Sequence, residues 1–191
     1  MKKIMFNDQY GLTEAVLDGR KTQTRRIAYQ EPFKRNFNSG FCTEGKDKGK
    51  LTINDGNEIV AKSHYKIGEV LAVAQRYEDI PMEPSIRTIL CKHPGWNNKM
   101  FVTAKTMPHQ IKIVNIRVER LQSISTDDCI DEGIVDFESQ IKKAHFYSIP
   151  NKYGTYDTAQ KAYAQLINKL SGKGTWGINP LVFVYDFELV K

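Results

Sequence analysis

The closing segment NPLVFVYDFELV, residues 179–190, limits the possible folds more than any other feature of the chain. It is apolar at nearly every position, so a strand there must be covered on both faces or lie inside a barrel. The segment 101–124 instead alternates apolar and polar residues, as a half-exposed strand does. The order of predicted elements lacks the regular strand–helix alternation of a parallel sheet. We therefore predict an α+β fold, a small mixed or antiparallel β-barrel flanked by short helices.

Three helices are predicted, over 10–19, 124–134 and 157–171. Ser125 or Thr126 caps the second helix, and Gly19 and Gly133 provide left-handed stops for the first and second. The third helix carries its apolar residues on one stripe, which is expected to face the core.

Strands and turns are predicted between these helices. Residues 51–63 read as a hairpin around Asp55-Gly56, and 65–78 as a turn at Gly68 followed by a strand. The proline-containing stretch 80–100 is predicted as a loop. In the strand region 101–124, Ile111 and Ile113 point inward and, after a phase shift, Ile116 and Val118 do so.

The positive charge is concentrated in one part of the chain. The net charge is +6, and residues 20–50 hold nine Lys/Arg against three Asp/Glu, so the remaining chain is neutral. Such asymmetry favours an anionic partner, most commonly nucleic acid. A solvated lysine-rich loop without a partner is the alternative for Lys46, Lys48 and Lys50.

Other sequence features narrow the class further. Asn7, Asp8 and Gln9 interrupt the apolar start, which argues against a signal peptide, and no segment has the ~20 apolar residues of a membrane span. We expect a cytoplasmic protein of one domain, residues 1–191. The three cysteines are far apart and no His/Cys grouping has the spacing of a zinc site, so neither metal nor cofactor is predicted.

Four stretches, in this order, carry a resemblance to a known family. They are GRKTQTRR (19–26), YKIGEVLAV (65–73), MPHQIKIVNIRVERLQSISTDDCIDEGI (107–134) and WGINPLVFVYDF (176–187). The chain resembles the ASCH domain in its longer, phage-associated form, with insertions at about 29–64 and 80–100 that could reshape the pocket. ASCH domains are similar to PUA domains, which implies a compact β-barrel with surrounding helices and an association with RNA or modified nucleosides.

The resemblance also implies a candidate active site. Small bacterial ASCH proteins include hydrolases that remove the acetyl group of acetylcytidine, and their pattern places a lysine on Lys21, a threonine on Thr24 and a glutamate on Glu132. The chain departs from those enzymes in its nearly doubled size and in having Ile27 after Arg26, where they tend to be acidic.

The chemistry of these residue types sets conditions on the site. Residues three apart on a regular strand point to opposite faces, so Lys21 and Thr24 can share a pocket only if 19–24 is a turn or an irregular entry to a strand. Thr24 needs a nearby base to act as a nucleophile, and Lys21 qualifies if burial and neighbouring arginines lower its pKa. Glu132 lies in the last turn of its helix, where the dipole disfavours a carboxylate by about 0.3–1 kcal/mol.

Two readings besides an amidohydrolase stay open. The chain could be an RNA-binding module without chemistry, or a metal-independent ribonuclease that uses the same lysine. For the binding function, the predicted phosphate-holding residues are Arg20, Arg25, Arg26, Lys34 and Arg35.

Overall fold

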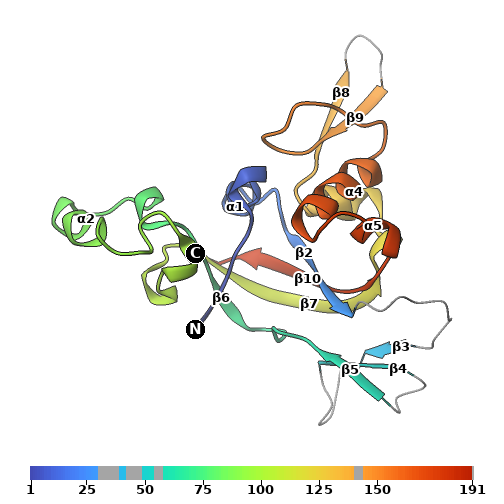
Figure 1. Ribbon diagram of the computed structural model, residues 1–191, viewed down its shortest axis with the longest axis horizontal. Coiled ribbons are helices and arrows are strands. Elements are labelled where there is room, and N and C mark those ends of the chain that lie inside the picture. Colours follow the sequence, from blue (N-terminus) through green and yellow to red (C-terminus); the bar gives the residue numbers. More distant parts are fainter. Residues whose placement is uncertain (30–38, 42–48, 54–57, 140–143, 191) are drawn as a thin grey trace.

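A computed structural model describes residues 1–29, 39–41, 49–53, 58–139 and 144–190. Its largest element is a five-stranded sheet in the order β1-β6-β7-β10-β2 (Figure 1). The bounds are β1 Lys2–Ile4, β2 Gln23–Tyr29, β6 Val70–Val73, β7 Gln110–Arg120 and β10 Leu181–Leu189. β1 pairs with β6 in parallel and the other pairings are antiparallel.

The predicted α+β class is confirmed, but the predicted barrel is wrong. The sheet stays open, with β1 and β2 as its edges. β10 is buried without interruption from Leu181 to Tyr185, as its apolar sequence requires. The covering comes from separate layers: α1, α4 and α5 lie on one side of the central strands, and the small sheet β3–β5 lies on the other (Figure 1). A closed barrel and separate covering layers were the two possible ways to bury β10, and the chain uses covering layers.

The phase shift predicted in the long strand is a β-bulge. In the β7–β10 ladder Asp186 pairs with Asn115 whereas Phe187 pairs with Ile113, so Val114 is the extra residue. An extra residue reverses the alternation of faces, which returns Ile116 to the buried side.

All three predicted helices are present. They are α1 Leu12–Leu17, α3 Thr126–Asp131 and α4 Ala159–Leu170, and α5 Thr175–Ile178 follows. Ser125 caps α3, since its hydroxyl accepts from the Asp128 backbone N–H and the Asp128 carboxylate accepts from the Ser125 N–H. α4 buries its apolar stripe in the main core.

The remaining elements include several that the sequence did not predict. The stretch 80–100 contains α2 Pro84–Leu90, and none of its residues is buried, although Ile86, Ile89 and Leu90 have helical spacing. The predicted hairpin is present as the antiparallel pair β4 Lys50–Ile53 and β5 Glu58–Lys62, while its Asp55-Gly56 turn lies outside the described residues. The other elements are β3 Ser39–Phe41, β8 Val135–Ser139, β9 Ala144–Ser148 and the 3-10 helices Asp8–Tyr10 (η1), Tyr77–Asp79, Lys99–Phe101, Ala104–Thr106 and Leu121–Ser123.

None of the helices in the described part of the chain combines the length and the apolar character that crossing a membrane requires.

Candidate functional site

Lys21 lies in the irregular connection between α1 and β2. α1 ends before Gly19, whose φ of +73° is a left-handed value, and β2 begins only at Gln23. The Lys21 N–H donates to the Ala15 carbonyl (2.9 Å), which turns the chain back across the end of the helix. The expectation of an irregular entry at 19–24 is therefore met, and the alternation of a strand does not separate Lys21 from Thr24.

Glu132 follows the last residue of α3, and its side chain is directed toward Lys21. Its backbone N–H donates to the Asp128 carbonyl (2.9 Å), and Gly133 then reverses the chain with φ +100°. A Cβ at position 133 would stand 3.3 Å from Leu12 Cδ2 and 3.7 Å from Lys21 Cδ. Glycine here lets α3 approach α1 and the lysine stem closely.

Lys21 and Glu132 form a buried ion pair. Lys21 Nζ donates to Glu132 Oε2 at 2.5 Å, and the two side chains are only 1% and 6% exposed. The same ammonium donates to the backbone carbonyls of Gln23 (2.7 Å) and Glu132 (2.8 Å). Three acceptors match the three N–H groups of a charged lysine, so its hydrogen bonds are complete within the protein.

Burial lowers the pKa of Lys21 below its ordinary value of 10.5. The Glu132 carboxylate opposes this effect, while the positive charges of Arg26 and Arg25 add to it. A lowered pKa increases the neutral fraction of the amine, and the neutral amine is the form that can accept a proton.

The second carboxylate oxygen of Glu132 accepts hydrogen bonds from residues of β2 and α4. Oε1 accepts from the Arg25 backbone N–H of edge strand β2 (2.6 Å), from Arg25 Nη1 (3.5 Å) and from the Tyr163 hydroxyl of α4 (3.4 Å). Burial, followed by the nearby Glu132 charge, raises the pKa of Tyr163 well above its usual value, so this phenol stays a hydrogen-bond donor. The carboxylate is thus fixed in orientation.

Thr24 lies on β2 and lines the same pocket as Lys21 and Glu132. The residue is buried and pairs with Tyr185 of β10, yet its hydroxyl makes no hydrogen bond to any residue that the structure describes. Thr24, Lys21 and Glu132 all line one pocket of about 680 Å³. This volume lies in the range of small-molecule sites. The remaining lining residues are Met5, Phe6, Asn7, Asp8, Gln9, Leu12, Arg25, Arg26, Ile27, Lys99, Tyr163, Ile167, Leu170 and Ser171.

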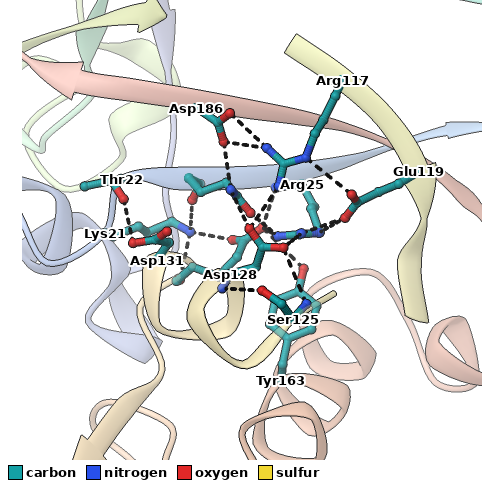
Figure 2. A network of polar contacts seen from close by, with 12 residues as sticks. Lys21, Thr22, Arg25, Arg117, Glu119, Ser125, Asp128, Asp131, Tyr163 and Asp186 are labelled. Atoms are coloured by element: carbon teal, nitrogen blue, oxygen red, sulfur yellow. Dashed lines mark hydrogen bonds and ion pairs between the residues drawn. The ribbon is translucent and has the colours of Figure 1, made fainter. Parts of the chain in front are cut away.

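Arg25 differs from its prediction as a phosphate-holding residue. Its side chain is 0% exposed, and its guanidinium contacts Glu119 (2.6 Å), Asp128 (3.1 Å) and Glu132 (3.5 Å) (Figure 2). These N–H groups are turned inward toward carboxylates and away from solvent. Arg25 therefore holds Glu132 in place, and its buried guanidinium is not accessible to a nucleic-acid phosphate.

A charged network that the sequence did not predict surrounds Arg25. Arg117 of β7 contacts Glu119, Asp128 and Asp186 at 2.8–3.3 Å, and the Gln23 amide donates to Asp128 and Asp186 (Figure 2). The alternation in the strand region 101–124 predicted only which apolar residues point inward. The partners of Arg117 and Glu119 lie on distant strands and on the cap of α3, so no local spacing signalled the network.

The other predicted phosphate-binding residues have mixed positions. Arg20 is exposed and pairs with Asp18 at 3.0 Å. Arg26 is exposed at the pocket, where one Nη donates to the Met5 carbonyl (2.8 Å). Lys34 and Arg35 lie outside the described residues. Lys99, from the stretch 80–100, lines the pocket and pairs with Asp8 at 2.8 Å.

Comparisons of the chain with protein-family models, with curated proteins and with solved structures found no match. Within the described ranges, no three His, Cys, Asp or Glu side chains gather in a way that could hold a metal ion.

Proposed function

We propose that this chain is an ASCH-type amidohydrolase that removes the acetyl group from an acetylated cytosine nucleoside. One observation carries the proposal: Thr24, whose hydroxyl has no hydrogen bond to a described residue, and a buried lysine–glutamate pair line the same pocket. The motifs that resemble the ASCH family name the same three residues, Lys21, Thr24 and Glu132. The open sheet departs from the barrel that this family implies, so the proposal rests on the site and the motifs.

In the proposed reaction Thr24 is the nucleophile. Its oxygen attacks the acetyl carbonyl carbon while its proton passes to the neutral Lys21 amine. The C–N bond then breaks, and Lys21 returns the proton to the exocyclic nitrogen of the departing cytidine. Water hydrolyses the acetyl ester on Thr24 and releases acetate. Glu132 holds the lysine and balances its charge after it has taken up the proton.

The experiment is to incubate the purified protein with acetylcytidine and to follow cytidine by chromatography. Turnover by the wild type and its loss in Lys21→Ala would support the proposal. Absence of turnover, or full turnover in Lys21→Ala with a folded protein, would reject it.

A second candidate is an RNA-binding module without chemistry, which the exposed Arg26 at the pocket and the basic segment 20–50 favour. Each neutralised phosphate releases counterions, so RNA affinity should fall steeply with salt concentration, and a flat response would reject this function. Cleavage of labelled RNA in the presence of a chelator would instead indicate a metal-independent ribonuclease that uses Lys21.

A further inference from the structure

A second pocket, of about 330 Å³, lies outside the candidate site and is lined mainly by basic residues. Its described lining residues are Lys2, Gly49, Lys62, Ser63, His64, Tyr65 and Lys66. None of these described lining residues is acidic. A cleft lined by charges of one sign concentrates their field and attracts ions of the opposite sign. We call this cavity the lysine pocket.

Two lysines of the lysine pocket have no acidic partner in the described part of the chain. Lys2 Nζ pairs with Glu69 at 3.0 Å, which balances its charge. Lys62 and Lys66 are exposed, and neither ammonium forms an ion pair with a described residue. The lysine pocket therefore keeps two positive charges that an anion from outside can reach.

The register of the small sheet places a further lysine next to Lys62. Lys50 of β4 stands directly opposite Lys62 of β5 in the antiparallel pair. Side chains directly opposite each other lie on the same face of a sheet, and like charges in that position destabilise the pair. A bound anion at Lys62 would offset this repulsion, which a sheet without a ligand gains nothing from.

In the wall of the candidate site, Arg26 is likewise a cation without an acidic partner among the described residues. The other cations of that wall, Lys21, Lys99 and Arg25, each contact a carboxylate. Arg26 is exposed and donates one hydrogen bond, to the Met5 carbonyl at 2.8 Å. A guanidinium carries five N–H donors, so the remaining ones can bind a phosphate beside the pocket.

The candidate site and the lysine pocket lie at the two ends of one short strand. Lys2 begins β1 and lines the lysine pocket, whereas Met5 follows β1 and lines the candidate site. A strand rises about 3.3 Å per residue, so these two residues lie about 10 Å apart along β1. Arg26 is also close to the lysine pocket: burial raises the pKa of Tyr65, and the charge of Arg26 opposes that rise. A few nucleotides of a single strand can therefore connect the two cavities.

We propose that the lysine pocket holds backbone phosphates of an RNA strand whose acetylated cytosine lies in the candidate site. The assignment rests on the proposed function for the identity of the base. Arg26 binds the phosphate nearest to that base, and Lys62 and Lys66 bind phosphates further along the strand. Free acetylcytidine still enters the candidate site but lacks these contacts, so the preferred substrate is a cytosine within a polymer.

The salt dependence of RNA binding tests the lysine pocket. The probe is a labelled, cytidine-rich single strand of about ten nucleotides, whose affinity is measured by fluorescence anisotropy. Each phosphate that a protein neutralises on a single strand adds about 0.7 to the slope of log affinity against log salt concentration. Lys62→Gln/Lys66→Gln should therefore reduce the slope by about 1.4 and weaken binding about 25-fold near ~0.1 M salt, the two affinities converging toward ~1 M.

Two controls separate this contact from a general effect of charge and from binding of a free nucleotide. Lys92→Gln/Lys105→Gln removes the same two charges from exposed lysines that line neither cavity, so its slope and affinity should match the wild type. The single phosphate of cytidine 5′-monophosphate reaches Arg26 but not the lysine pocket. Its affinity should therefore be the same in the wild type and in Lys62→Gln/Lys66→Gln.

Four results would overturn the assignment. They are an unchanged slope in Lys62→Gln/Lys66→Gln, an equal loss in the control variant, an equal loss for the mononucleotide, and no RNA binding by the wild type. The melting midpoint should stay at the wild-type value, because the two ammonium groups form no ion pair with a described residue. A loss of RNA affinity that comes with a lower midpoint would indicate a structural role and contradict the assignment.

The outcome is distinguishable from that of the proposed function. If RNA binding depends on Lys62 and Lys66 but the wild type releases no cytidine from acetylcytidine, the amidohydrolase proposal fails and the phosphate contacts stand. If acetylcytidine is hydrolysed, and acetylated RNA has the same KM with the wild type and with Lys62→Gln/Lys66→Gln, the phosphate contacts fail and the enzyme stands.

Discussion

Replacing Glu132 with glutamine keeps the shape of the side chain but removes the carboxylate that faces the buried Lys21 ammonium. Arg25 keeps its contacts with Glu119 and Asp128, so the main loss falls on the lysine. Removing one partner of a buried ion pair typically costs about 3–5 kcal/mol, because the other charge is left without a counter-ion in a dry environment.

An upper limit for this loss follows from the titration of the lysine. Unpaired Lys21 can escape the cost of burial by releasing its proton, which from its ordinary pKa of 10.5 costs about 5 kcal/mol at pH 7 and about 2 kcal/mol at pH 9. We therefore expect Glu132→Gln to lower the free energy of unfolding by about 3–5 kcal/mol at pH 7, and by at most about 2 kcal/mol at pH 9.

The assay is urea unfolding followed by circular dichroism at both pH values. Thermal unfolding gives a second measure of the same loss. In a chain of this size each kcal/mol shifts the melting midpoint by roughly 2–4 °C, so the variant should melt about 6–20 °C lower at neutral pH. Glu119→Gln is the control: this half-buried carboxylate leaves Arg25 with two others, so its loss should be small and nearly independent of pH. A loss below about 1 kcal/mol for Glu132→Gln, or an equal loss at pH 7 and pH 9, would refute the reasoning.

Three further predictions concern the same region. Because the folded pKa of Lys21 is lowered, the unfolded state binds more protons between that value and 10.5, so wild-type stability should rise with pH there; the difference from Lys21→Met, measured by urea unfolding, should show this rise. Burial raises the pKa of Cys129 to about 12, so iodoacetamide should label exposed Cys91 and spare Cys129 in the native protein, and equal labelling in peptide maps would contradict the packing. Gly133→Ala should cost about 1–3 kcal/mol, because its φ of +100° and the approach to Leu12 strain any side chain, and an unchanged melting midpoint would show that this turn can relax.

Local patterns in the sequence predicted the elements that end in recognisable residues. Gly19, Ser125 and Gly133 mark the ends of α1 and α3, and the structure places these ends where the two candidate residues emerge. The reversal of alternation in β7 was visible as a phase shift and is a bulge at Val114. Such features depend on a few neighbouring residues, which is why the sequence reveals them.

Features that depend on distant partners were missed. The apolar strand β10 was compatible with either a barrel or covering layers, and only tertiary packing decides between them. Arg25 looked like part of an exposed basic patch because its carboxylate partners lie on β7 and α3, far along the chain. The place of Lys99 in the pocket was hidden for the same reason, since its partner Asp8 lies 91 residues away along the chain.

The rate of cytidine release from acetylcytidine by Thr24→Val, compared with that of the wild type, tests the central claim most directly. Valine preserves the shape of threonine and a β-branched residue on β2, so the buried Lys21–Glu132 pair should survive and the melting midpoint should change little. The account predicts turnover by the wild type and its loss in the folded valine variant. Equal rates for the two proteins, or no turnover by either, would contradict it.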